Sequence, residues 1–232
     1  GKMLTKEEAS AKSGLAASAV KYMQDMDRYV AGQLSASRMM SSVERVYFAF
    51  DRLSMNAAPT PAEQYALRIR EKFPAIEVKS CSRLLASLRA IKTPEEVACI
   101  RKAGDVTIEA LRQMLRTAKP GEFEYQWAAD FEHYVARAGM RLGFTTIAAA
   151  GENAVMLHYS DNNCPVKAGD LVLFDLGAEY GYYSSDVSRT FPVSGKYSDR
   201  QKELYNIVLE AMDIARDKMR PGEPTRGPPP AA

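Results

Sequence analysis

Hydrophobic residues recur every three or four positions in several stretches of the chain and predict amphipathic helices. The strongest start signal is TPEE at 93–96, where a capping threonine precedes a proline and two acids. The apolar face of this helix continues to Met114 and ends before the KPG segment at 119–121. Further helices are expected over about 123–138 and from Ser198 onward.

Short apolar runs between these helices predict strands. VYFAF at 46–50 and IEVK at 76–79 are strand candidates in the first part, and FTTIAAAG at 144–151 is one in the second. LVLFDLGAEY at 171–180 and GYYSSDVSRTF at 181–191 follow each other directly. This arrangement predicts a β-hairpin with its turn between Tyr180 and Gly181.

The pattern changes at residue 92 and predicts two domains. Residues 1–91 alternate short helices and strands, which is typical of part of a small α/β domain. Residues 92–222 contain helices, a strand and a hairpin, an α+β arrangement. Residues 223–232, EPTRGPPPAA, have no apolar periodicity and are expected to form a disordered tail.

Two aspartates in the predicted hairpin carry the candidate chemistry. A turn between Tyr180 and Gly181 places Asp175 directly opposite Asp186, with Cβ atoms about 4.5–5.5 Å apart. Like charges at that distance repel, so such a pair either shares a proton or binds a cation. Carboxylate oxygens suit hard divalent metals, and paired ions are common in hydrolases. The alternative is a turn placed elsewhere, with one aspartate capping a loop and the other solvated.

Composition excludes several classes of function. The chain has 232 residues with a net charge of +2, and its basic residues are interleaved with acids. This predicts no nucleic-acid partner. The three cysteines lack any CxxC spacing, which favours free thiols and a cytoplasmic location. No apolar stretch is long enough to span a membrane, so no membrane partner is expected.

The remaining candidates are two histidines and two tyrosines. His133 is predicted to be a surface or packing residue within a helix, whereas His158 lies in a polar loop before the hairpin. His158 could donate a hydrogen bond to a substrate carbonyl or carry a proton, although a single loop histidine is more often structural. Tyr182 and Tyr183 could pack their rings or support a metal ligand through a hydroxyl.

Three stretches resemble one enzyme family: KTPEEVACIRKAG from residue 92, GENAVMLHYSDNNCPVKAGDLVLFDLGAEYGYYSSDVSRTFPVSGK from residue 151, and a helix ending RPG. They are similar to the pita-bread metallopeptidases, in particular the Xaa-Pro aminopeptidase (aminopeptidase P) and proline dipeptidase branch. The resemblance implies that residues 92–222 form the first half of a pita-bread catalytic domain. Residues 1–91 resemble part of the creatinase-like amino-terminal domain of such enzymes.

The resemblance also implies roles for individual residues. Asp175 matches a ligand of one metal ion, Asp186 a carboxylate that bridges two, and His158 a histidine that contacts substrate without binding metal. The implied reaction is hydrolysis of an amino-terminal Xaa-Pro bond by a hydroxide activated between two divalent ions. Manganese is expected, with cobalt or zinc as alternatives. The implied substrate is a peptide with proline at its second position, and the full-length form is expected to be a homo-oligomer.

The family's second half supplies a histidine and two glutamates to the metal site, and this sequence contains no match to them. We therefore expect the chain to be a truncated, inactive fragment of a metallo-aminopeptidase. Two alternatives are a proline dipeptidase and a non-catalytic pita-bread module that binds peptides or proteins. An apolar face left uncovered by the missing half is expected to make the chain self-associate.

Overall fold

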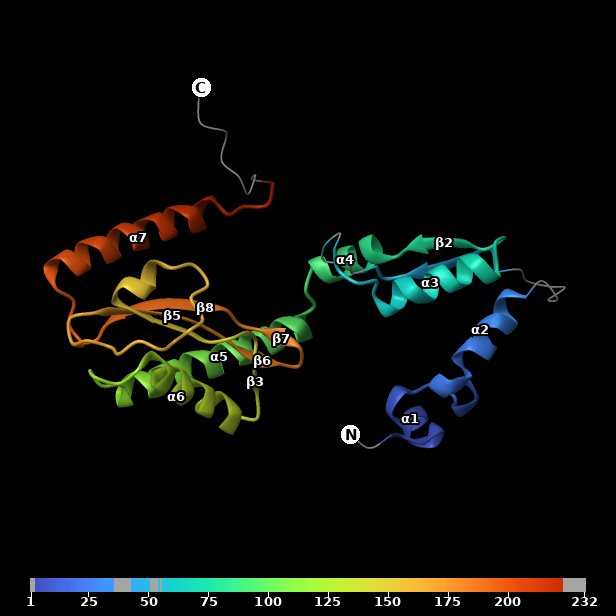
Figure 1. The fold of residues 1–232 in the computed structure, drawn as a ribbon, viewed down its shortest axis with the longest axis horizontal. Coiled ribbons are helices and arrows are strands. Elements are labelled where there is room, and N and C mark those ends of the chain that lie inside the picture. The colour runs from blue at the N-terminus through green and yellow to red at the C-terminus, as the bar shows by residue number, and fades with distance from the viewer. Residues whose placement is uncertain (1–2, 36–42, 51–53, 55, 223–232) are drawn as a thin grey trace, which may run out of the picture. The chain divides into compact units, whose positions relative to one another are not determined.

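The computed structural model describes residues 3–35, 43–50, 54 and 56–222, so the proposed tail at 223–232 lies outside the described residues. The chain forms two compact units, Gly1–Ile91 and Lys92–Ala232. Each unit is an assembly of helices and short strands (Figure 1).

The second unit combines helices with two small antiparallel sheets. The sheets have the strand orders β4-β5-β8 and β3-β6-β7. Its elements are α5 (Pro94–Thr117), α6 (Glu124–Arg137), β3 (Arg141–Leu142), β4 (Ile147–Ala150), the 3-10 helix η3 (Gly151–Val155), β5 (Leu171–Leu176), β6 (Ala178–Tyr180), β7 (Tyr183–Ser184), β8 (Val187–Pro192) and α7 (Asp199–Lys218). The three predicted helices are thus confirmed, and the strand expected over 144–151 is limited to β4.

The core of this unit lies between β5 and the two helices α5 and α6. Side chains alternate along a strand, so Val172, Phe174 and Leu176 share one face, and all three are buried. The Phe174 ring stacks on Trp127 of α6 with ring centroids 5.9 Å apart. From α5 come the buried residues Ala110, Leu111 and Met114. The other face of β5, which carries Asp175, is only half-buried.

Helix α7 contributes no buried residue to this core. It begins with a capping box: Ser198 Oγ accepts from Gln201 N at 3.2 Å, and the Gln201 side chain accepts from Ser198 N at 2.9 Å. Figure 1 shows the strands between α7 and α6. Seven large hydrophobic residues of α7 are exposed: Leu204, Tyr205, Ile207, Val208, Leu209, Met212 and Ile214. The helix therefore has apolar surface that the described residues leave uncovered.

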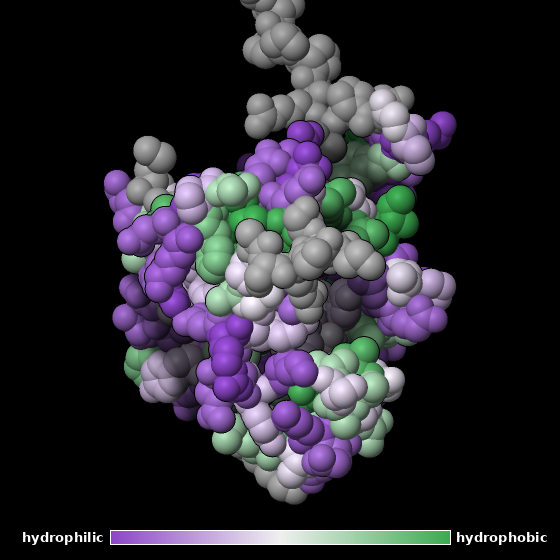
Figure 2. Space-filling view, turned by 90° about the vertical axis from the view of Figure 1, so that its right-hand side faces the viewer, coloured by the Kyte–Doolittle hydropathy of each residue, from purple (hydrophilic) through white to green (hydrophobic). Residues whose placement is uncertain are grey.

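Hydrophobic residues also reach the surface elsewhere. On the face drawn in Figure 2 they lie among hydrophilic residues. Within the part of the chain that the structure describes, none of the helices is long and apolar enough to cross a membrane.

The first unit is built around a parallel pair of strands. Its elements are α1 (Lys6–Ser13), the 3-10 helices η1 (Ala17–Ala19) and η2 (Met23–Asp25), α2 (Met26–Leu34), β1 (Arg45–Phe48), α3 (Pro61–Lys72), β2 (Glu77–Ser80) and α4 (Ser82–Ala90). Strands β1 and β2 pair in parallel. Thr5 and Thr60 form capping boxes at the starts of α1 and α3.

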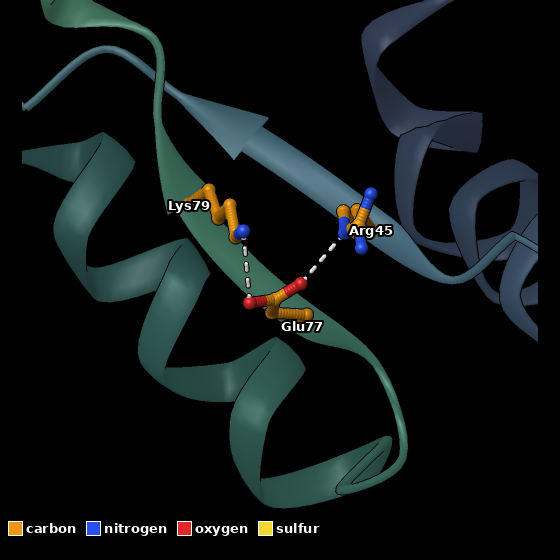
Figure 3. A network of polar contacts seen from close by, with 3 residues as sticks. All are labelled: Arg45, Glu77 and Lys79. Carbon is orange, nitrogen blue, oxygen red and sulfur yellow. Dashed lines mark hydrogen bonds and ion pairs between the residues drawn. The ribbon is translucent and has the colours of Figure 1, made fainter.

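A charged cluster joins the two parallel strands. The Glu77 carboxylate lies 2.7 Å from Arg45 Nε and 3.1 Å from Lys79 Nζ (Figure 3). Arg45 and Glu77 are paired across β1 and β2, so the contact matches the strand register. The hydrogen bond from Arg45, followed by that from Lys79, lowers the pKa of Glu77. All three side chains are about half exposed, and such pairs add little to stability.

Candidate metal centre

The hairpin that carries the two aspartates has a different register from the predicted one. Tyr180 pairs with Tyr183, so the central turn residues are Gly181 and Tyr182, one position further along the chain than expected. Both have positive φ, 58° and 68°, as a two-residue type I′ turn requires. When the turn moves by one residue, each residue of one strand faces a partner two positions further along the other strand. Asp175 therefore lies opposite Ser188, and the predicted pairing with Asp186 is wrong.

The shift leaves both aspartates on the same face of the hairpin. Side chains alternate with a period of two, so a two-residue change of register preserves the face. Asp186 becomes the diagonal neighbour of Asp175, and diagonal Cβ atoms are about 7–8 Å apart. The two carboxyl groups interact: the pKa of Asp186 is raised by partial desolvation, then by the negative charge of Asp175 and a hydrogen bond to it. Asp186 is exposed, so water screens much of this effect.

Asp175 lies near the end of β5, the central strand of its sheet. Its neighbours across the sheet are Ile147 on β4 and Ser188 on β8. Ser188 Oγ donates a hydrogen bond of 2.9 Å to Asp175 Oδ1. Asp175 is half-buried and Asp186 is exposed, so both side chains are accessible to solvent.

Backbone contacts hold the segment that precedes Asp186. A Cβ added to Gly177 would lie 1.9 Å from the backbone oxygen of Ser185, so only glycine fits there without movement. The Ser185 hydroxyl lies 2.7 Å from that of Thr107 on α5, and Ala178 N donates to Thr107 Oγ1 at 2.8 Å. Thr107 is fully buried. The helix thus fixes the strand next to Asp186.

Sequence reasoning missed both Thr107 and Gly177 as supports of the site. Thr107 lies among the apolar positions of its helix, and its hydroxyl partner is 78 residues away in the sequence. A glycine inside a strand-like run is a recognised sign that another backbone segment approaches closely. Gly177 is such a glycine, within LVLFDLGAEY.

The oxygen-rich pair fits part of a site for a hard divalent cation. A cation would relieve the repulsion that raises the pKa of Asp186. Among the described residues there is no cluster of three or more histidine, cysteine, aspartate or glutamate side chains able to hold a metal. Asp175 and Asp186 therefore fit as two ligands of a larger set.

His158 follows η3 in an exposed loop. Its backbone φ is 55°, in the left-handed region that is uncommon for residues other than glycine. In the described portion of the chain, no hydrogen bond or ion pair links His158 to Asp175 or Asp186, so its place in a common site stays a prediction. His133 is exposed on α6, as expected.

The two tyrosines of the hairpin differ in their surroundings. Tyr182 occupies the turn with 90% of its surface exposed, so its ring is not packed. Tyr183 is half-buried and pairs with Tyr180 across the hairpin. Its hydroxyl donates to Glu96 Oε1 at 2.5 Å and is the largest cause of a lowered pKa of Glu96. This bond ties the hairpin to the first turn of α5.

Comparison with known proteins is consistent with this geometry. A Xaa-Pro aminopeptidase of Escherichia coli is 43% identical over 136 residues, which cover 58% of this chain and 31% of the relative. A Xaa-Pro dipeptidase of Rattus norvegicus is 36% identical over 144 residues, covering 60% and 29%. The solved structure of zinc-substituted E. coli aminopeptidase P in complex with product superimposes with a TM-score of 0.80 at 31% identity.

That structural match covers 96% of this chain and 50% of the solved one. The chain thus spans about a third of the length of the curated relatives and half of the solved enzyme. Together with the mixed helix and sheet architecture, this confirms a partial pita-bread fold. The sequence profile of metallopeptidase family M24 matches residues 98–226, more than half of the chain. The chain belongs to metallopeptidase family M24.

Proposed function

We propose that this chain supplies part of the active site of a metal-dependent aminopeptidase that hydrolyses amino-terminal Xaa-Pro bonds. The observation that carries the proposal is the carboxylate pair: Asp175 and Asp186 share one face of a hairpin, and the pKa of Asp186 is raised in part by the charge of Asp175. The similarity to Xaa-Pro aminopeptidases supports the choice of substrate.

In this proposal each residue has one role. Asp175 and Asp186 would hold the two divalent ions as oxygen ligands, since carboxylate oxygens suit hard cations. The ions, when bound, would supply the Lewis acidity that activates water for attack on the peptide carbonyl. His158 donates a hydrogen bond to the substrate near the bond that is broken. Ser188, which donates to Asp175, orients that carboxylate.

The chain alone is proposed to be inactive. Only two metal-binding acids come together in the described residues, and two ligands hold a divalent ion weakly. The remaining ligands must come from outside this set. We also propose manganese as the ion and the cytoplasm as the location, the latter in keeping with the free thiols of Cys81, Cys99 and Cys164.

Calorimetric titration with Mn²⁺ tests the metal assignment. Asp186→Ala is expected to abolish the binding heat, whereas Glu179→Ala, which removes a nearby acid paired with Ser184 in the hairpin, is expected to preserve it. Equal binding in the wild type and Asp186→Ala would contradict the proposal. Substantial hydrolysis of an Xaa-Pro peptide by the isolated chain with Mn²⁺ would contradict only the proposed inactivity of the chain and would leave the metal assignment in place.

A proline dipeptidase is the second candidate, since the chain is also similar to Xaa-Pro dipeptidases. When the missing ligands are supplied, cleavage of a tripeptide with proline in second place would favour the aminopeptidase. Cleavage restricted to a dipeptide ending in proline would favour the dipeptidase.

A non-catalytic binding module is a third candidate, because the described residues bring together no more than two candidate metal-binding acids. Such a module would retain a bound peptide or protein partner after EDTA treatment, and loss of the partner together with the metal would argue against it.

Self-association is proposed to occur through the exposed apolar residues of α7. Light scattering is expected to show oligomers of the isolated chain whose proportion rises with concentration. A monomer at high concentration would contradict this.

A further inference from the structure

Glu124, the first residue of α6, is a fully buried acid that the proposed reaction does not use. Its carboxylate accepts four hydrogen bonds. Oε1 accepts from Ala150 N at 2.7 Å and Asn153 Nδ2 at 2.9 Å. Oε2 accepts from Tyr159 OH at 2.6 Å and Cys164 N at 3.0 Å. Buried acids are rare in proteins, and four donors match the acceptor capacity of one carboxylate.

The four donors lie on both sides of His158 in the sequence. One carboxylate oxygen holds residues 150 and 153, before the histidine, and the other holds residues 159 and 164, after it. Glu124 therefore fixes both ends of the segment 154–158. A single side chain on a packed helix determines where this loop begins and ends.

The loop has little else to hold it. Leu157 is 95% exposed and Val155 85%, so apolar packing does not restrain the segment. His158 nevertheless has a left-handed backbone, which costs free energy and persists only where the surroundings impose it. The residue directly after it, Tyr159, is buried and bonded to Glu124.

A second anchor lies further along the same loop. Asn162, also left-handed, accepts from Ala148 N at 2.9 Å and donates to Thr146 O at 2.7 Å. This contact ties the loop to β4 but leaves the backbone before residue 159 free. Asn153 Nδ2 also donates to Tyr159 OH at 3.1 Å, which links the two ends of the segment directly. Both of these side chains are bonded to Glu124, so the contacts that restrain the backbone at His158 meet at its carboxylate.

We propose that Glu124 is a positioning residue that holds His158 in a single backbone conformation for contact with the peptide substrate. The inference rests on the proposed function for the role of His158. It adds that this role depends on a buried carboxylate on α6, which itself touches neither substrate nor metal.

The chemistry of the contacts predicts which substitution removes this control. Burial, and then the hydrogen bond to Glu124, raise the pKa of the Tyr159 phenol, so Tyr159 remains a donor at neutral pH. An amide at position 124 would direct its NH₂ group toward donors on one side. Glu124→Gln should therefore lose contacts at one end of the loop while keeping the volume of the side chain.

The two histidines allow a direct test by NMR of the whole chain labelled with ¹³C at histidine. His158 reports on the loop, and His133, exposed on α6 about two and a half turns after Glu124, reports on the helix. In Glu124→Gln we expect the His158 imidazole resonance to move toward its position in the urea-unfolded chain, with the His133 resonance unchanged. Tyr159→Phe removes one donor to Glu124, together with the hydroxyl that accepts from Asn153 Nδ2 and Asn163 N, and keeps the other three donors to Glu124. It should move the His158 resonance in the same direction by a smaller amount. Glu132→Gln on the same helix is the control for His158 and should leave the His158 resonance in place; because Glu132 adjoins His133, only the His158 resonance is read in this variant.

The proposal is overturned if the His158 resonance stays in place in both Glu124→Gln and Tyr159→Phe. It is also overturned if the His133 and His158 resonances move together in Tyr159→Phe, because Glu124 then only supports the helix. Should Glu124→Gln not fold, the Tyr159→Phe result decides alone. Neither metal nor substrate is used, so this outcome is independent of the Mn²⁺ titration that tests the proposed function.

Discussion

Glu124 and Asp186 are acids of the same unit with opposite surroundings. Glu124 is completely buried and accepts four hydrogen bonds from the protein. Asp186 is exposed, and the like charge of Asp175 acts on it. Within the contacts that the structure describes, one hydroxyl, that of Ser188, donates to the aspartate pair.

The difference separates a structural acid from a ligand-binding one. A carboxylate whose acceptor sites are all filled by protein donors has no capacity for a metal or substrate, and its removal leaves those donors unpaired. A pair of acids with few donors gains from a cation and costs little to remove. Whether protein donors fill the acceptor sites of a carboxylate therefore distinguishes the two roles better than burial alone.

The largest expected effect is on stability. Glu124→Ala leaves two backbone amides, a phenol and a side-chain amide without their acceptor, and should lower the free energy of unfolding by about 3–5 kcal/mol. Asp186→Ala should change it by no more than about 0.5 kcal/mol in the absence of metal. Urea denaturation of both variants measures the difference. Equal losses would remove the distinction between the two acids.

Next in size is the effect of the backbone contact beside Asp186. Gly177→Ala brings a methyl group to 1.9 Å from the Ser185 oxygen, so the strand must move, at an expected cost of about 1–3 kcal/mol. Gly169→Ala, with no atom within 4 Å of the new methyl group, is the control and should be neutral or slightly stabilising. Thermal denaturation compares them, and an unaffected Gly177→Ala would mean that the hairpin is not held there.

The hydroxyl of Thr107 should matter somewhat less. Thr107→Val keeps the shape but leaves Ala178 N without its buried acceptor, which is expected to cost about 1–2 kcal/mol. Thr117→Val on the same helix removes a hydroxyl that bonds Met114 O and Asp130, and should cost less because that residue is exposed. Chemical denaturation curves measure both. A larger loss in Thr117→Val would contradict the role assigned to Thr107.

The smallest expected effect concerns pH. Because the pKa of Asp186 is raised above its ordinary value of 3.8, the folded chain binds this proton more tightly than the unfolded chain. The metal-free protein therefore loses stability as the pH rises from about 3.8 through the raised value, and Asp186→Asn should not show this part of the loss. Exposure should limit the effect to about 0.5 kcal/mol. Unfolding curves between pH 3 and 7 with EDTA measure it, and a loss that persists undiminished in Asp186→Asn would refute this assignment.

Local features of the fold were readable from the sequence. The caps at Thr93 and Ser198 involve residues three positions apart, so their chemistry lies within one short segment. The face of the two aspartates was predicted despite the wrong pairing, because alternation along a strand survives a shift of two residues.

Features that depend on distant contacts were not readable. The two possible turns, Tyr180-Gly181 and Gly181-Tyr182, each contain one glycine and one tyrosine, and a type I′ turn puts both of its central residues at positive φ, so residue preference does not separate them. Glu124 resembles an ordinary acid in the first turn of a helix. Its donors lie 26 to 40 residues further along the chain, and only the folded loop shows that they converge on it.

Helix α7 has a consequence for how the unit opens. With no buried residue, its backbone amides are protected from solvent exchange mainly by the helix itself, so they should exchange with deuterium well before those of α5, which has five buried residues. Slow exchange in α7 would then be the mark of a partner, and the residues that slow down would map where that partner lies.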